Sequence, residues 1–372
     1  MCNALAKTIS MALSASGRLR SAMSDPARED VYSYVQGIFQ RGLVVVVGSG
    51  ASCALGLPGM QALATYLIAE VPVRASGLPP ESMASWHLVA EALDAGKGLE
   101  ETLLTVSVPD DLALVVTQAI ADCVLAAEQN AIADILTSAS ISAFGRLLLF
   151  ALQATPALDV VTTNYDRLVE VHAARAGVRI DSSFYGHTVG RFDPALSRDE
   201  LLQMQRTSVR GRKNTVVQRP HVKLSKPHGS LDWYSRDGQH YRSDLPIGGS
   251  RRIVAPGGNK YRLGYEVPFD AHRTRANDSI DRASALLFIG YGFNDDHLQT
   301  HIVDRIPQVP TVIVSKDLTD PAREHLRLNS SAVGIESGAN LNESHVIRGT
   351  SKISIDKALW DLEYLVKEVL AS

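Results

Sequence analysis

A continuous apolar run over residues 43–47, with the sequence Leu-Val-Val-Val-Val, constrains the fold more than any other part of the chain. The run ends abruptly in the turn Gly48-Ser49-Gly50. Apolar runs of this length that are closed by glycine are typical of parallel strands buried on both faces. Apolar side chains then recur at helical spacing over residues 57–70, so this region predicts a strand, a glycine turn and a helix.

The same strand pattern recurs three times, and helical patterns follow two of the later runs. The strand runs cover residues 158–162, 285–289 and 311–314, and the helical patterns cover 166–176 and 296–306. Alternating strands and helices predict an α/β fold with a Rossmann-like, doubly wound parallel sheet. Residues 71–157 are rich in Ala, Leu and Glu and are too numerous for a simple crossover, so we expect a helical insertion or subdomain there.

The remaining segments complete the expected domain organisation, a single domain over residues 28–372. Residues 184–219 and 241–275 lack periodic apolar positions and predict irregular loops, and residues 357–370 predict a closing amphipathic helix. Residues 1–27 predict a disordered or ragged terminus. Their composition fits either a start site at Met11 or Met23 or a transit peptide.

Charge and cysteine content exclude several classes of function. The chain has 372 residues, with 37 basic and 40 acidic side chains. Its overall electrostatic field therefore does not favour binding to nucleic acid or to an anionic membrane. No apolar run approaches the roughly 20 residues that a membrane-spanning helix needs. The three cysteines include no CxxC pair, which excludes a four-thiolate zinc site and favours a reducing, cytoplasmic location.

The turn from Gly48 to Ser52 stands where phosphates bind in many nucleotide-binding folds. Glycine lets the backbone approach a ligand closely, and the first turn of a helix offers unpaired N–H donors. The GxGxxG fingerprint is incomplete here because Cys53 follows, and no lysine completes a Walker loop. A tight turn without a ligand is therefore the alternative interpretation.

Four short motifs, in order along the chain, give a more specific indication. They are Gly48-Ser49-Gly50-Ala51-Ser52 with Gly56-Leu57-Pro58, Thr163-Asn164-Tyr165-Asp166, His228-Gly229, and Gly290-Tyr291-Gly292-Phe293-Asn294-Asp295. Three of them follow predicted strands, where open α/β sheets bind their ligands. In this set and order the chain resembles the sirtuin superfamily. The resemblance implies NAD as the ligand, cleaved as a substrate.

Departures from the deacylating sirtuins point to one branch of the superfamily. No cysteine follows Cys123, so the four-cysteine zinc module of those enzymes is missing and we expect no zinc. The Thr163–Asp166 and Gly290–Asp295 motifs look closer to bacterial sirtuin-like antiphage effectors, which hydrolyse NAD. The resemblance therefore implies an NAD glycohydrolase of an abortive-infection system, controlled by homo-oligomerisation or by a partner such as a HerA-type ATPase.

Two polar residues are the candidate catalytic groups. An asparagine amide positions water without carrying charge, and a histidine accepts a proton at cellular pH. We therefore expect Asn164 to position water and His228 to act as a base or to orient the ribose. The alternative roles are a helix N-cap for Asn164 and an ordinary loop histidine for His228.

The resemblance assigns the remaining polar positions to NAD binding. Asp166 is expected to contact the carboxamide or ribose, with helix-dipole complementarity as its alternative. The other expected NAD-binding residues are Gly48, Ser49, Gly50, Ala51, Ser52, Thr163, Gly290, Gly292 and Asn294. Asp295 and Asp296 resemble a metal pair but more often cap a helix, so no metal is assigned.

Two other functions stay open at the level of sequence. Protein deacylation or ADP-ribosyl transfer would need a peptide groove, and the missing zinc cysteines argue against it. A non-catalytic sensor of NAD or ADP-ribose would need neither Asn164 nor His228 to be intact. Trp233, five residues after His228, fits either a wall of the nicotinamide pocket or the core.

Overall fold

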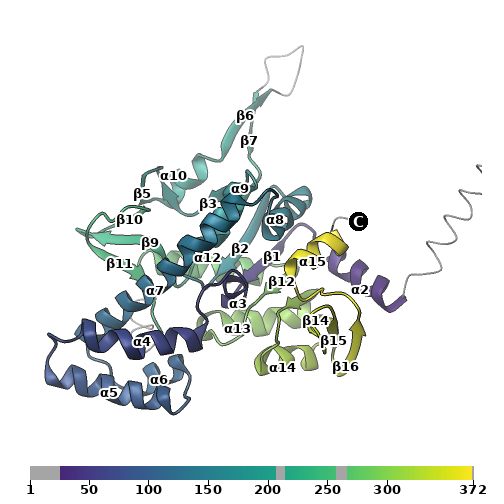
Figure 1. Cartoon of the computed structure of the whole chain (residues 1–372). Helices are drawn as coiled ribbons and strands as arrows, with labels where there is room; N and C mark the ends of the chain where they lie inside the picture. The colour runs from purple at the N-terminus through teal and green to yellow at the C-terminus, as the bar shows by residue number, and fades with distance from the viewer. Residues whose placement is uncertain (1–25, 207–213, 257–265, 371–372) are drawn as a thin grey trace, which may run out of the picture.

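A computed structural model describes residues 26–206, 214–256 and 266–370 (Figure 1). Residues 1–25 of the expected ragged terminus therefore lie outside the described part. Helix α2 (Pro26–Gly37) is the first described element. Within these ranges, no helix combines the length and the apolar character that crossing a membrane requires.

A nine-stranded sheet forms the centre of the fold. Its order is β16-β15-β14-β13-β12-β1-β2-β8-β3, parallel from β14 to β3 and antiparallel at β15 and β16. The strands are β1 (Leu43–Val47), β2 (Ala157–Thr162), β3 (Arg179–Asp181), β8 (His221–Ser225), β12 (Ala285–Ile289), β13 (Thr311–Val314), β14 (Ala332–Ser337), β15 (Ser344–Arg348) and β16 (Ser351–Ile355). The chain leaves β1 toward β2 and later crosses to β12 on the other side, so the strand order reverses at β1.

Strand β1 is apolar throughout because helices cover both of its faces. Val45 and Val47 pack on one face, and Val44 and Val46 pack on the other. The first face is covered by α2, α8 (Ala143–Ala154), α9 (Leu168–Arg175) and the C-terminal turns, and the second by α12 (Phe269–Asp281), α13 (Asp296–Arg305) and α14 (Asp320–Leu328). The predicted doubly wound, Rossmann-like α/β fold is confirmed.

A group of helices after β1 has a hydrophobic core of its own. After the short helix α3 (Ser49–Cys53), four helices pack on one another: α4 (Met60–Arg74), α5 (Pro80–Asp94), α6 (Leu99–Thr105) and α7 (Asp110–Thr137). Leu67, Val89 and Leu112 are fully buried among them. The next helix, α8, packs on the sheet through β2 instead. A helical insertion is therefore present, and its limits at about residues 71–157 stay a prediction.

The expectation of irregular loops over residues 184–219 and 241–275 is wrong for the residues that the structure describes, and its parts at 207–213 and 257–265 lie outside them. These residues contribute to a second, antiparallel sheet of order β11-β9-β10-β5-β4 and to the ribbon β6–β7, which projects from the body of the molecule (Figure 1). The elements are β4 (Phe184–Tyr185), β5 (Val189–Phe192), α10 (Pro194–Asp199), β6 (Leu202–Arg206), β7 (Asn214–Gln218), β9 (Gly229–Arg236), β10 (Gln239–Ser243) and β11 (Ser250–Ile253). Most of these strands are short and carry few periodic apolar residues, so their conformation depends on pairing, both with the next strand, as in β9–β10, and with more distant ones, as in β10–β5.

The closing helix begins later than the sequence pattern predicts. Helix α15 covers only Leu362–Leu365 and continues as a π-helical turn, η2 (Val366–Leu370). Asp361 accepts a hydrogen bond from the backbone N–H of Glu363 at 2.7 Å and so caps the helix at that point. The expected start at Lys357 is therefore wrong, because a local cap outweighs the apolar periodicity.

A buried histidine joins α8 to α9 and gives the fold a predictable response to acid. The Nδ1 atom of His172 lies 2.7 Å from the hydroxyl of Ser142, the N-cap of α8, and burial lowers the pKa of His172 to about 4. The unfolded chain, with its histidine pKa near 6.5, binds this proton more readily than the folded protein does. The contribution of neutral His172 to the free energy of unfolding is therefore complete above pH 6.5 and is lost as the pH falls toward 4.

We expect His172→Gln to flatten this acid dependence. The free energy of unfolding of the unmodified protein should fall more steeply between pH 6.5 and pH 4, by up to about 1.4 kcal/mol per pH unit, than that of the variant. Urea unfolding at several pH values measures both slopes. His187→Gln, at an exposed position, is the matched control and should leave the slope unchanged. Equal slopes for the unmodified protein and His172→Gln would contradict the prediction.

Candidate functional site

The expected motifs meet at the carboxyl ends of β1, β2, β8 and β12, where they surround a cavity of about 210 Å³. This is the edge of an open α/β sheet at which ligands bind, next to the point where the strand order reverses. The predicted residues that line the cavity are Gly48, Ser49, Ser52, Thr163, Asn164, Asp166, His228, Gly292 and Asn294. Gly50, Ala51 and Gly290 do not line it.

The two glycine turns after β1 and β12 contact each other through their backbones. The Gly50 N–H donates to the Gly290 carbonyl at 2.9 Å, and the Gly48 N–H donates to the Ile289 carbonyl at 3.0 Å. A Cβ atom on Gly48 would lie 2.4 Å from the Gly290 carbonyl oxygen, and one on Gly290 would lie 2.3 Å from the Ala51 nitrogen. Glycine is required here for contact between turns, and two amides of the first turn are already engaged.

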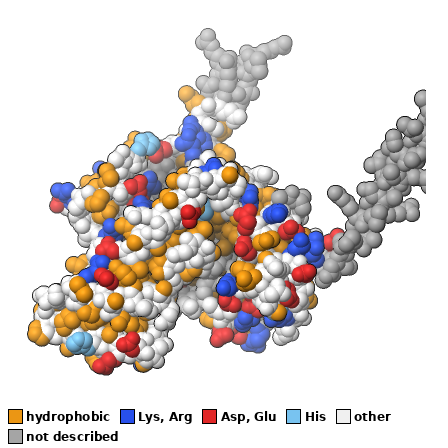
Figure 2. Space-filling model, viewed as in Figure 1, with side chains coloured by type: hydrophobic (Ala, Val, Ile, Leu, Met, Phe, Trp, Pro, Cys, Tyr) orange, Lys and Arg blue, Asp and Glu red, His pale blue; other side chains and the backbone are white. Residues whose placement is uncertain are grey.

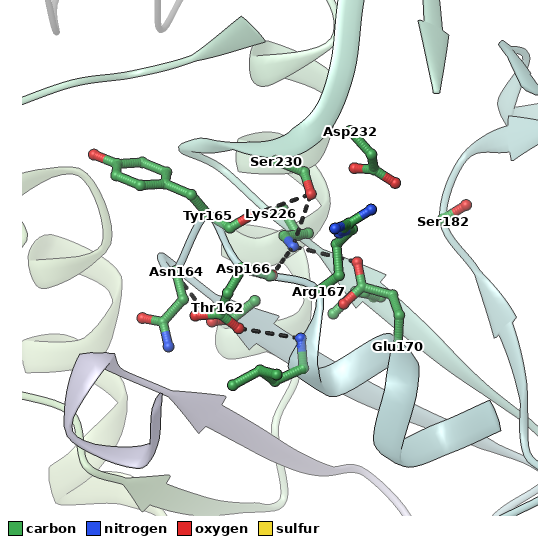
Figure 3. Close-up of polar contacts among 12 residues, drawn as sticks. Thr162, Asn164, Tyr165, Asp166, Arg167, Glu170, Ser182, Lys226, Ser230 and Asp232 are labelled. Atoms are coloured by element: carbon green, nitrogen blue, oxygen red, sulfur yellow. Dashed lines mark hydrogen bonds and ion pairs between the residues drawn. The ribbon is translucent and has the colours of Figure 1, made fainter. Parts of the chain in front are cut away.

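Asn164 lies in the loop after β2, with its side chain toward α3 (Figure 3). Its Nδ2 donates to the Gly48 carbonyl at 3.0 Å and to the Ser52 hydroxyl at 2.8 Å. Its backbone N–H donates to the Thr162 hydroxyl at 3.1 Å. These contacts hold the amide in one orientation at the cavity wall. The backbone N–H of Asn164 thus binds the last residue of β2, whereas its side chain joins the loop after β2 to the turn after β1.

Asp166 is buried beside Asn164 and completes a short chain of polar contacts. Its Oδ2 accepts a hydrogen bond from the Ser52 hydroxyl at 2.7 Å, and its Oδ1 accepts one from the Leu168 N–H at 3.2 Å. Burial raises the pKa of the Asp166 carboxyl, while the charge of Lys226 and the Ser52 hydrogen bond oppose the rise. Leu168 is the first residue of α9, so the Asp166 carboxylate binds an amide at the start of that helix, before its N-cap Arg167, and also lines the cavity.

His228 faces the cavity from the segment between β8 and β9, and its partner is a residue that the sequence analysis left out of the site. The His228 Nε2 lies 2.8 Å from Oδ2 of Asp295, and both side chains are largely buried. The sequence pattern around Asp295 indicates only a helix cap. Its position directly after a glycine loop at a strand end could have indicated a site residue, but its pairing with His228 depends on the fold. A carboxylate at this distance fixes the orientation of the imidazole.

Gly229, the second residue of the His-Gly motif, is required by its surroundings. Its φ is +81°, and a Cβ atom would lie 2.2 Å from the Arg252 carbonyl oxygen. The Val254 N–H donates to the His228 carbonyl at 2.9 Å, so the backbone on both sides of the turn is held against the strand end of β11. The glycine therefore lets His228 turn toward the cavity while the chain continues into β9.

The last motif, after β12, forms another part of the cavity wall. Tyr291 and Phe293 are buried and pack against Phe288, with ring centroids 5.8 and 4.7 Å from its ring. The Gly292 carbonyl accepts a hydrogen bond from the Thr319 hydroxyl at 2.8 Å. Asn294 is exposed at the rim. The aromatic residues thus anchor the loop, and the polar ones face the cavity.

A buried lysine, also absent from the sequence-based site, lies behind the cavity (Figure 3). The side chain of Lys226 is only 2% exposed, and its ammonium donates to the Asp166 carbonyl, the Ser230 hydroxyl and the Glu170 carboxylate. Burial raises the pKa of Glu170, and Lys226 opposes the rise. The sequence around Lys226 gives no clear signal of its burial, because the preceding strand His-Val-Lys-Leu-Ser is mixed in character and carries a second lysine, Lys223.

Two other expectations concern residues near the site. Trp233 is buried 4.6 Å from the His272 ring and close to Phe184, so it belongs to a separate aromatic core and not to the cavity. Within residues 26–206, 214–256 and 266–370, no group of three or more His, Cys, Asp or Glu side chains is placed to hold a metal ion.

Comparison with known proteins adds one finding about family. Residues 159–332, a little under half of the chain, match the sequence model of the SIR2-like domain. Over these residues the chain is similar to the SIR2-like domain. The SIR2-like range contains Asn164, Asp166, His228 and Asp295, but it begins after β1 and the first glycine turn. No curated protein matches the chain.

Solved structures that resemble the chain are similar only at a distance. One, on the structural basis of sirtuin substrate affinity, is 15% identical, with 81% of this chain and 91% of that chain covered and a TM-score of 0.36. A second, on the mechanism and regulation of Sir2 enzymes, is 12% identical, with 92% and 100% covered and a TM-score of 0.39. A Sir2 homologue in complex with NAD is 15% identical, with 79% and 84% covered and a TM-score of 0.33. Scores this low carry no argument about the site.

The contact between the glycine turns gives a direct test of the site's geometry. We expect Gly48→Ala to lower the free energy of unfolding by about 1–3 kcal/mol, because its methyl group would overlap the Gly290 carbonyl. Gly37→Ala is the matched control, since no heavy atom lies within 4 Å of its added carbon. Chemical denaturation of both variants measures the difference. Equal stability of the two would show that the turns are not in contact.

Proposed function

We propose that this chain is an NAD glycohydrolase, which converts NAD and water into nicotinamide and ADP-ribose. The observation that carries the proposal is the convergence of Asn164 and His228 on one cavity, with Asp295 behind the histidine. The two side chains come from different strand ends, and each is held by contacts that fix its orientation. The SIR2-like match over residues 159–332 supports NAD as the ligand.

The reaction assigns a distinct role to each residue. The bond between the nicotinamide nitrogen and the ribose carbon breaks with its electron pair leaving on nicotinamide, and a water oxygen forms the new bond to that carbon. Asn164 positions the water, and His228 accepts its proton. The Asp295 carboxylate, 2.8 Å from Nε2 of His228, stabilises the imidazolium that forms when the histidine accepts this proton.

The cavity fits one end of the dinucleotide. Its volume of about 210 Å³ is smaller than the roughly 300–1,000 Å³ of most small-molecule sites, so it encloses the reacting end and leaves the remainder of NAD outside. Leu57, Pro58 and Met60 supply an apolar side suited to a nicotinamide ring. Ser49, Ser52, Thr163 and Asp166 supply polar groups for the ribose and the pyrophosphate. The Gly48 and Gly50 N–H groups already donate to backbone carbonyls, so the phosphates would bind to these side chains and to other backbone amides.

We propose a cellular setting on the basis of the resemblance to antiphage effectors. In that setting the chain acts in the cytoplasm, depletes NAD during infection, and is held inactive until a homo-oligomer or a HerA-type ATPase partner assembles on it. Exposed apolar side chains on the helical insertion support an assembly surface, and hydrophobic atoms gather over these helices (Figure 2). They include Val73, Leu88, Leu104, Leu114 and Leu136.

The first experiment compares nicotinamide release by purified variants. We expect Asn164→Ala and His228→Ala each to lower the turnover of NAD by at least about 10²-fold, because each removes a group that acts on water or its proton. Asp295→Asn should also lower turnover, because the histidine loses its carboxylate. Chromatographic separation of nicotinamide, ADP-ribose and cyclic products gives the rates.

His87→Ala, at an exposed position of the helical insertion, is the control and should keep full activity. Thermal unfolding verifies that each variant is folded. Unchanged turnover in Asn164→Ala and His228→Ala would refute the assignment of the site. NAD binding by the unmodified protein without nicotinamide release, at all concentrations and with the partner present, would favour a sensor.

Assembly is tested by the dependence of activity on concentration. We expect nicotinamide release per mole of chain to change with protein concentration, or on addition of a HerA-type ATPase, because binding to a partner shifts the population of the active form. Light scattering reports the mass of the assembly in the same samples. Constant specific activity over a hundredfold dilution, with and without the ATPase, would exclude control by assembly.

A further inference from the structure

Lys226 occupies a position that is costly for a lysine. Its side chain is 2% exposed at the end of β8, where the strand is otherwise mostly buried. An ammonium group removed from water is tolerated only when its protons are bound. Here three acceptors take them: the Asp166 carbonyl at 2.5 Å, the Ser230 hydroxyl at 3.0 Å and the Glu170 carboxylate at 3.2 Å. The donors of the ammonium are therefore fully used.

The three acceptors belong to three segments that carry or adjoin the site. Asp166 is two residues after Asn164, Ser230 is two residues after His228, and Glu170 lies in α9. Ser230 in turn donates to the Tyr165 carbonyl at 3.3 Å, and the Leu231 N–H donates to the same carbonyl at 3.0 Å. Lys226 therefore lies at the junction of the two loops that carry the proposed catalytic side chains (Figure 3).

A continuous series of contacts leads from the ammonium to the Asn164 amide. Lys226 holds the Asp166 backbone, the Asp166 carboxylate accepts from the Ser52 hydroxyl at 2.7 Å, and Ser52 accepts from Asn164 at 2.8 Å. A buried ion pair by itself is weak evidence for a stabilising role, because apolar side chains of similar size often stabilise a protein as well or better. The position of this one, between two functional loops, indicates a different purpose.

We propose that Lys226 is a positioning residue of the NAD-cleaving site, whose ammonium holds the Asn164–Asp166 loop against the segment that carries His228. The inference rests on the proposed NAD glycohydrolase function. Lys226 does not touch the substrate in this role. It sets the distance and angle between the water-positioning amide and the base, and misplacement of such groups by about 1 Å can lower a rate about 10²-fold.

The test separates positioning from simple charge compensation. Lys226→Met alone would leave Glu170 without its cation and lower stability, so the informative protein is the double variant Lys226→Met/Glu170→Gln, which removes both charges. Its matched control is Glu170→Gln, in which the glutamine oxygen still accepts from the ammonium. We expect Glu170→Gln to retain nearly full kcat, and the double variant to lose about 10²-fold in kcat with KM changed less than about threefold.

A second control addresses the loss of a lysine from the same strand. Lys223→Met removes a partly exposed lysine of β8, whose ammonium lies 3.9 Å from Asp159, and should leave kcat unchanged. Partial recovery of kcat in Lys226→Arg/Glu170→Gln, relative to the methionine double variant, would further support a positioning role. A kcat for the methionine double variant within threefold of that of Glu170→Gln would overturn the proposal.

Hydrogen exchange tests the inference even if the chain does not cleave NAD. In the double variant, the amides of Leu231 and Leu168, which bind the Tyr165 carbonyl and the Asp166 carboxylate, should exchange faster than in Glu170→Gln. The amides of β12 should be unchanged. Absence of nicotinamide release from every protein, at all concentrations and with the ATPase partner present, would refute the glycohydrolase but leave this comparison valid. Unchanged exchange at both loop amides would refute the positioning role.

Discussion

The contact between the glycine turns after β1 and β12 is the constraint on which the site depends. Because no side chain separates Gly48 and Gly50 from Gly290, the two strand ends approach within backbone hydrogen-bonding distance. The Gly48 carbonyl then serves as an acceptor for Asn164, and the chain after Gly290 continues to Asp295, the partner of His228. A bulkier turn would separate these groups by more than hydrogen bonds can span.

The central part of the sheet could be predicted from the sequence, whereas its periphery could not. Strands such as β1 and β12 are covered by helices on both faces, so burial alone makes them continuous apolar runs. Most strands of the second sheet are short, and some carry few apolar residues, as in Ser250–Ile253 with the sequence Ser-Arg-Arg-Ile. Part of their pairing joins segments distant in sequence, as between Tyr241 and Arg191, and a local pattern carries little information about such pairing.

The candidate site was predictable to the same limited extent. Residues directly after strands, such as Asn164 and His228, were found because the ends of parallel strands meet at one edge of a sheet. Asp295 and Lys226 were missed because each makes its decisive contact with a residue distant in sequence. Gly50 and Gly290 were correctly singled out as special, but the structure uses them for contact between turns and not as cavity wall. Sequence shows that a glycine is needed and does not show what approaches it.

The position of β1 in the sheet also bears on how the chain reaches its folded state. This strand is synthesised long before its neighbour β12, so the pairing of Leu43 with Ala285 must wait until the segment between the two strands has been made. Until then an uncharged run rich in β-branched residues has an unpaired edge, the kind of segment that associates with other chains. The interval between the synthesis of β1 and that of β12 is therefore a vulnerable stage for this protein.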